Sequence, residues 1–314
     1  MIRNRTESGE TTVPARHPAG DRLTIFLLEN GSVRGAACTA SGMVNEMRSA
    51  HGLDILETLV LGHAYMGAAL MASNLKSGGD RLVLQIDCSG PIRGLVVEAN
   101  AAGQVRGYLK QVPILIEKEP RDFDLSPFFG AGFLKVTRYL EDAKQPFTGQ
   151  VMLEHGNLAQ DLAVYYRMSE QTPTALALSI QFDAEGTAVG AGGLLLQVMP
   201  GAAEGIADRL EPIIAGLPSI GKFVAAGGRM DHLVRDAFDG LSPKLLEHRS
   251  LSFFCPCSRE RLRSVIMLLP EKDLLDLKEN GPFPVEMRCH NCNAAYAFTA
   301  SEIEEIYGLR RSDN

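Results

Sequence analysis

Residues 82–109 read LVLQIDCSGPIRGLVVEANAAGQVRGYL, and this stretch decides the predicted fold class. Its extended runs are rich in Leu, Val and Ile, and the interruptions SGP and NAAG are turn sequences. The runs are 82–87, 95–98 and 105–109, and the turns are 89–91 and 100–103. Strands joined by such short connections pair antiparallel, because a parallel pair needs a long crossover. We therefore expect an antiparallel sheet here.

A second pair of strands and two helices extend this pattern over residues 22–201. The runs 175–182 and 194–199 are joined through the turn sequence DAEG and predict another strand pair. Apolar residues recur at helical spacing in 55–73 and in 158–170. Strand pairs combined with helices indicate an α+β core domain, in which mixed antiparallel sheet and helices form packed layers.

The segment after this core, residues 202–254, is predicted to be a helical linker. Helical patterns cover 202–215 and 230–238, and several Gly and Pro residues interrupt them. Helices this short are marginal on their own, since most helical stability comes from packing an apolar face against a neighbour. The linker is therefore expected to fold only against another part of the protein.

The C-terminal residues 255–314 carry a cysteine pattern that indicates a metal site. Cys255-Pro256-Cys257 precedes Cys289-His290-Asn291-Cys292, and two close cysteine pairs separated by a small insert are a strong zinc signal. We expect all four cysteines to bind Zn²⁺. Four thiolates complete the tetrahedron and leave no position for water, so the pattern argues against zinc hydrolysis.

The insert between the cysteine pairs is helical and too small to be stable alone. Ser258 is placed to cap a helix whose apolar stripe is Leu262, Val265, Ile266 and Leu269. Structural zinc contributes on the order of 10 kcal/mol to domains of this kind. Loss of the metal is therefore expected to unfold residues 255–314.

The same sulfurs can also be oxidised, which would couple metal release to unfolding and make the domain a switch. The other interpretation is a permanent structural zinc ribbon. Cysteine spacing leaves both interpretations open.

Composition narrows the remaining function classes. The net charge is −7 with no concentrated basic stripe, which argues against nucleic acid as a partner. Residues 1–21 are polar, lack a secretory signal and are interpreted as a mobile tail. Residues 58–75 carry no charge, but Gly, Asn and His dilute their apolarity and favour a buried helix over a membrane span. These features predict a cytoplasmic protein.

Several weaker motifs are given ordinary interpretations. Residues 216–222, GLPSIGK, resemble a phosphate-binding loop, but Phe223 replaces the Ser or Thr and a helical run precedes the motif, so ATP binding is not expected. The glycines of 190–193 are interpreted as the approach to a strand, and the acidic run 302–305 as the solvated face of a terminal helix. Single residues interpreted as packing or surface positions are His248, His290, Cys38 and Cys88.

At the level of whole motifs, the sequence resembles the bacterial redox-regulated 33-kDa chaperonins, the heat-shock protein 33 family. The resemblance rests on FFCPCSRERL (253–262), MRCHNCNAAYAF (287–298), YYRMSEQTPTALALS (165–179) and GGLLLQVMP (192–200). The resemblance extends beyond these motifs and covers the chain from about residue 22 to residue 306.

The resemblance implies an ATP-independent holdase chaperone, not an enzyme, whose partners are unfolded or misfolded client proteins. It implies a reduced, zinc-bound, inactive state with the linker folded onto the core. It further implies that oxidation under stress forms the disulfides Cys255–Cys257 and Cys289–Cys292, expels zinc, unfolds the switch and linker, and accompanies homodimer formation. A thiol-disulfide oxidoreductase that uses Cys289 and Cys292 remains the alternative from another class, with a constitutive zinc-ribbon binding protein beside it.

Overall fold

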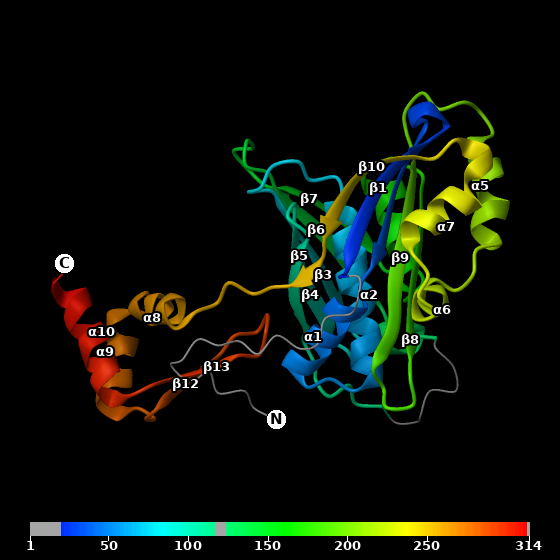
Figure 1. Ribbon diagram of the computed structural model, residues 1–314. Helices are drawn as coiled ribbons and strands as arrows, with labels where there is room; N and C mark the ends of the chain where they lie inside the picture. Colours follow the sequence, from blue (N-terminus) through cyan, green and yellow to red (C-terminus); the bar gives the residue numbers. More distant parts are fainter. Residues whose placement is uncertain (1–19, 117–123, 313–314) are drawn as a thin grey trace. The chain divides into compact units, whose positions relative to one another are not determined.

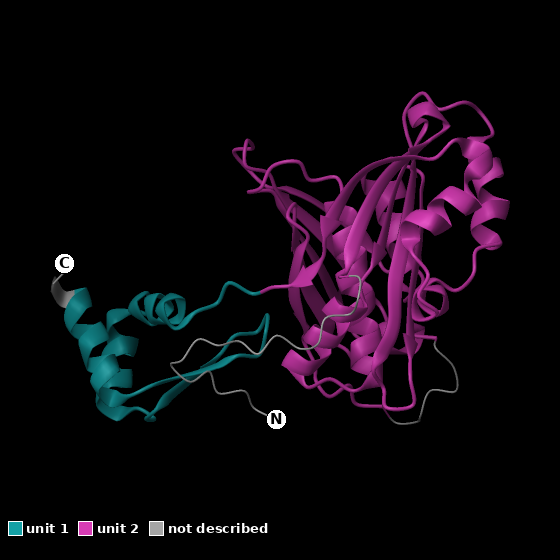
Figure 2. Cartoon of the chain, viewed as in Figure 1, with its two compact units in different colours: residues 1–14, 255–314 teal, residues 15–254 magenta. Residues whose placement is uncertain are grey.

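The computed structural model describes residues 20–116 and 124–312 (Figure 1). The predicted tail, residues 1–21, lies outside the described residues except for Gly20 and Asp21. The described residues form two compact units that divide between Phe254 and Cys255 (Figure 2). The finer division into 22–201, 202–254 and 255–314 stays a prediction.

The larger unit contains two β-sheets within its described residues. The first sheet has the order β10-β1-β2-β9-β8, and every neighbouring pair in it is antiparallel. Its strands are β1 (Arg22–Leu28), β2 (Val33–Thr39), β8 (Thr174–Phe182), β9 (Ala188–Val198) and β10 (Lys244–Ser250).

The second sheet has the order β11-β5-β4-β3-β6-β7 and is antiparallel except between β11 and β5. Its strands are β3 (Arg81–Cys88), β4 (Gly94–Asn100), β5 (Gln104–Leu109), β6 (Gly132–Tyr139), β7 (Phe147–Met152) and β11 (Ser252–Phe253). The predicted strands in residues 82–109 and their antiparallel pairing are confirmed.

Helices fill the space between the two sheets (Figure 1). Helix α2 packs on β4 and β5 of one sheet and on β8 and β9 of the other. Of its 18 residues, 83% are buried. Although α2 is long and apolar enough to span a membrane, this burial confirms the prediction of a core helix. Helix α2 is Ile55–Ala72, and the helical segments beside it in this part of the chain are η1 (Glu29–Gly31), α1 (Ser41–His51), α3 (Ser126–Phe129) and α4 (Leu158–Ser169).

The glycines at 190–193 lie inside β9 rather than before a strand, so that interpretation was wrong. Helix α6 (Ile220–Ala225) packs closely against the strand here. A Cβ on Gly190 would lie 2.1 Å from the carbonyl oxygen of Gly221. Glycine is therefore required by the close approach of helix and strand, and the segment remains extended.

The segment 202–254 packs on the face of the first sheet opposite α2 (Figure 1). Its helices are α5 (Ile206–Ala215), α6, α7 (Met230–Ala237) and η2 (Asp239–Leu241). Phe238 stacks on Phe26 of β1 with ring centroids 6.4 Å apart. The segment also contains β10 and β11, which the prediction of helices missed. Most residues of β10 are exposed, and its sequence KLLEHRS lacks an alternating apolar pattern.

Arg249 of β10 provides a polar contact between this segment and the rest of the unit. Its guanidinium donates to the carbonyl oxygens of Leu75 and Ala101, at 3.3 Å each, and pairs with Glu247. The nearby Arg34 has a lowered pKa, first because of burial and second because Arg249 repels it. Arg249 therefore satisfies two backbone acceptors at some electrostatic cost.

Replacing Arg249 with methionine is expected to destabilise the docked β10 by about 1–2 kcal/mol, since both carbonyls lose a charged donor while repulsion of Arg34 is relieved. Faster amide exchange in 244–250 than in β9 would reveal the loss. Arg167→Met is the matched control, because both partners of the Arg167–Glu154 pair are exposed and such a pair contributes little. Unchanged exchange in β10 would contradict the assignment.

The smaller unit is a hairpin packed against three helices, within the described residues 255–312. Strands β12 (Val285–Arg288) and β13 (Ala295–Phe298) pair antiparallel, and the helices are α8 (Arg259–Met267), α9 (Glu271–Asn280) and α10 (Ala300–Ser312). Ser258 accepts a hydrogen bond from the Arg261 amide at 3.3 Å, which confirms the predicted cap of α8. The buried core is small: Ile266, Leu274, Tyr296, Phe298, Ile303 and Ile306.

One prediction for this unit needs correction. Val265 does not pack in the core with the rest of the apolar stripe, because 50% of it is exposed. The acidic run at 302–305 lies on the solvated face of the terminal helix α10, as predicted, and its three glutamates also pair with basic residues of α8 and α9. The pairs are Glu302–Arg259, Glu305–Arg263 and Glu304–Lys278. These ion pairs attach α10 to its neighbours in a unit with few buried side chains.

Candidate functional site

Two short backbone segments present the four cysteines of the smaller unit. Cys255 and Cys257 lie in the extended chain before α8, and Arg261 donates to the carbonyl of Pro256 at 3.0 Å. Cys289 and Cys292 lie in the turn between β12 and β13. The turn closes through hydrogen bonds from the Asn293 amide to the Cys289 carbonyl and from the Cys289 amide to the Ala294 carbonyl. Both segments thus hold their sulfurs on backbone fixed by hydrogen bonds.

The four sulfurs converge at one point. All four Sγ atoms lie within 4.8 Å of one another, as sulfur ligands of a metal ion do. The Sγ atoms of Cys255 and Cys289 are 3.7 Å apart, and those of Cys257 and Cys292 are 3.2 Å apart. Zn–S bonds of about 2.3 Å give a tetrahedron with edges of about 3.8 Å. The cluster is therefore positioned to bind a metal.

The electrostatics of the cluster favour a bound cation. The neighbouring sulfurs, Cys255 foremost, raise the pKa of Cys289 to about 11. They raise the pKa of Cys292 as well, again chiefly through Cys255. Crowded sulfurs resist joint deprotonation because thiolates repel one another, and a dication removes this penalty. Four thiolates are a donor set that suits zinc.

Tyr296 is a part of the site that sequence reasoning missed. Its hydroxyl lies 3.3 Å from the Cys257 Sγ and donates to the Cys257 carbonyl, also at 3.3 Å. Along β13, Tyr296 and Phe298 are buried and Ala297 between them is exposed. This alternation of large and small residues was the sequence signal for a buried Tyr296.

The other candidate residues lie outside the cluster. His290 is exposed on the turn, and His248 contacts the Thr24 hydroxyl within the larger unit. Cys38 is fully buried, and burial raises the pKa of its thiol to about 12. Burial also raises the pKa of the half-buried Cys88. Thiols with raised pKa values in apolar surroundings are unreactive, which agrees with their interpretation as packing residues.

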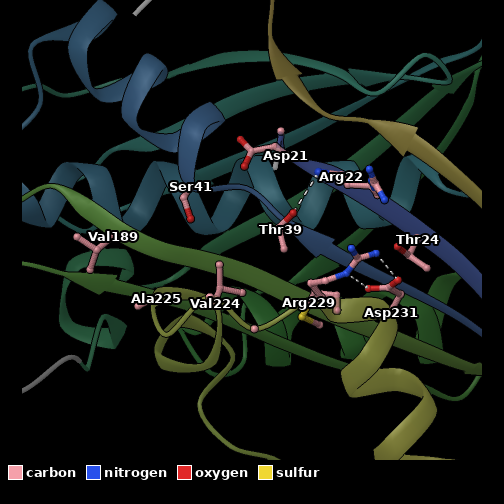
Figure 3. Close-up of a pocket in the computed structure, with 14 residues that line it drawn as sticks. Asp21, Arg22, Thr24, Thr39, Ser41, Val189, Val224, Ala225, Arg229 and Asp231 are labelled. Carbon is pink, nitrogen blue, oxygen red and sulfur yellow. Dashed lines mark hydrogen bonds and ion pairs between the residues drawn. The ribbon is translucent and has the colours of Figure 1, made fainter. Parts of the chain in front are cut away.

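The larger unit has a pocket of about 440 Å³ between β1, β2 and the start of α7 (Figure 3). Its charged lining is largely paired: Asp21 accepts from the Met43 amide, and Arg229 pairs with Asp231. The motif 216–222 contributes no phosphate loop nearby, because it runs from the end of α5 into α6 rather than from a strand into a helix. The pocket shows no catalytic arrangement in its lining.

Comparisons with known proteins agree with this architecture. The family model described as "Hsp33 protein" matches residues 21–299. A 33 kDa chaperonin of Ruminiclostridium cellulolyticum is 34% identical and covers 91% of this chain and 98% of its own. One of Symbiobacterium thermophilum is 36% identical, with coverages of 91% and 97%. The crystal structure of a 33 kDa chaperonin from Thermotoga maritima superposes with a TM-score of 0.82 at 30% identity, covering 94% of this chain and all of that one.

Proposed function

Since the chain belongs to the Hsp33 family and has the function of a chaperone, we propose that it is a redox-regulated, ATP-independent holdase. It binds unfolding proteins under oxidative stress and is inactive while reduced. It acts in the cytoplasm, is not an enzyme, and binds neither nucleic acid nor membranes. The convergence of the four sulfurs within 4.8 Å is the observation that carries the proposal.

In the reduced state, Cys255, Cys257, Cys289 and Cys292 bind Zn²⁺. Zinc supplies the cross-link between the two cysteine segments that the small apolar core of this unit cannot replace. The hydrogen bond from the Arg261 side chain to the Pro256 carbonyl and the backbone hydrogen bonds at Cys289 keep the sulfurs oriented. Zinc binding in this way makes residues 255–314 a switch domain.

On oxidation, disulfides form within each cysteine pair, Cys255–Cys257 and Cys289–Cys292. Each disulfide takes two sulfurs from the metal, so zinc leaves and the unit unfolds. The linker 202–254 then leaves the core domain 22–201. Its departure exposes the face of the first sheet that carries Phe26, Leu28, Leu194 and Leu196. This apolar surface suits unfolded client segments and the homodimer of the oxidised protein.

The test measures zinc content, free thiols and suppression of client aggregation in the same samples before and after peroxide. We expect the reduced protein to hold one zinc ion and to leave aggregation unchanged. Oxidation should remove the zinc, consume four thiols and start suppression of aggregation.

Two outcomes would contradict the proposal. Equal suppression in both states would favour a constitutive zinc-ribbon protein. Catalytic disulfide exchange with a dithiol substrate, without holdase activity, would favour the oxidoreductase.

A further inference from the structure

The hydroxyl of Tyr296 makes a polar contact with one sulfur of the cluster. Only 8% of Tyr296 is exposed, and the side chain belongs to the buried core of the smaller unit. Its position on β13 is fixed by pairing with Met287 of β12. The ring is thus held by packing and strand pairing, while the hydroxyl reaches the Cys257 Sγ at 3.3 Å.

The direction of this hydrogen bond follows from the proposed zinc-bound state, in which Cys257 is a metal ligand. A thiolate ligand has no proton, so it can only accept one from the tyrosine hydroxyl. The hydroxyl also lies 3.3 Å from the carbonyl oxygen of the same cysteine, and its single proton is shared between two acceptors of Cys257. Both acceptors belong to Cys257, so the proton stays beside this residue.

A proton donated to a thiolate withdraws electron density from the sulfur and makes it a weaker nucleophile. Oxidation by a peroxide begins with attack of a thiolate on a peroxide oxygen, which breaks the O–O bond, forms a sulfenic acid and releases hydroxide. A second thiolate then displaces hydroxide from that sulfur and forms the disulfide. Two sulfurs lose two electrons in total, and one hydrogen peroxide becomes two hydroxide ions.

We propose that Tyr296 is a positioning residue that protects Cys257 from oxidants through this hydrogen bond and thereby sets the oxidant level at which the switch opens. The inference deepens the proposed redox function and rests on it for its consequence in the cell. The hydrogen bond itself is a property of the reduced cluster. Its effect on Cys257 can therefore be measured without any oxidation.

Tyr296→Phe removes the hydroxyl and keeps the ring that packs in the core. The primary measurement is alkylation of the reduced, purified protein by iodoacetamide, read cysteine by cysteine with peptide mass spectrometry. We expect Cys257 to react about fivefold faster in the variant, the rate equivalent of one hydrogen bond, relative to Cys292 in the same chain. An unchanged ratio of Cys257 to Cys292 adducts would overturn the inference.

Tyr307→Phe is the matched control, because Tyr307 lies in the same unit with its ring facing Lys278. This variant should alkylate like the unmodified protein. Zinc loss to a chelator without oxidant separates protection from simple destabilisation: it should be unchanged in Tyr296→Phe. A rise in chelator-driven loss equal to the rise in alkylation would show a merely structural role and overturn the proposal.

Peroxide-driven zinc release completes the test and separates the two hypotheses. Tyr296→Phe should release zinc on the order of fivefold faster than the unmodified protein, the same factor as for alkylation. If neither protein releases zinc with peroxide, the proposed function fails, while the alkylation ratio still decides the role of Tyr296.

Discussion

Replacing Cys257 with serine is expected to unfold residues 255–314 in the reduced protein and to leave the core, residues 22–201, folded. Serine is a poor ligand for zinc, and loss of one of four ligands removes most of the metal's affinity. Structural zinc supplies on the order of 10 kcal/mol, more than the total stability of a small domain. The six buried core side chains among the described residues of this unit cannot make up such a loss.

Three measurements follow this unfolding in the reduced state. The zinc-to-protein ratio should fall towards zero, amides of β12 and β13 should exchange without protection, and protease should cut within 258–312. Cys88→Ser is the control, because Cys88 is a half-buried thiol at the end of β3, outside the cluster. Protease resistance equal to that of the unmodified protein would contradict the assignment of four thiolate ligands.

The sequence predicted the local parts of this fold well. Residues 82–109 form the expected three strands because their turn residues and apolar alternation act over short distances. The same is true of α2 and α4, whose apolar spacing extends over several turns. The four cysteines were recognised as a cluster because ligand spacing in a chain reflects the geometry of one ion.

The features that the sequence did not reveal depend on contacts between distant segments. β10 forms a strand because it pairs with the edge of β1. Its own sequence has little of the apolar alternation that predicts a strand. Gly190 lies within a strand because α6 packs over it. Tyr296 reaches Cys257 only when β13 has paired with β12. A short-range pattern in the chain can indicate which side chains are buried, as the alternation at 296–298 does, but it does not identify their partners.

The packing of 202–254 gives the proposed C-terminal switch a means of acting on the core. Its helices bury the apolar residues of β1, β2 and β9 that face away from α2. These residues would face water without the segment. Release of the segment also removes the edge strands β10 and β11, while the other strands of both sheets and most of the main core keep their contacts.

Phe238→Ala is therefore expected to release this cover without oxidation. Phe238 is 1% exposed and stacks on Phe26, and truncation of a buried phenylalanine costs about 3–5 kcal/mol. The loss falls on the contact between the docked segment and the first sheet, because Phe238 packs in the cluster between α5–α7 and that sheet. We expect the reduced variant, with zinc still bound, to suppress client aggregation and to exchange amides in 206–250 faster than those in β3 and β4.

Phe147→Ala is the control for the loss of a phenyl ring, since Phe147 is 61% exposed on β7 and its truncation leaves no cavity. It should remain inactive when reduced, with unchanged exchange in 206–250. For Phe238→Ala, amide exchange tests whether the side chain holds the segment, and suppression of aggregation tests where clients bind. Unchanged exchange would show that this side chain does not hold the segment. Fast exchange without suppression of aggregation would show that clients bind elsewhere than on the uncovered face of β1, β2 and β9.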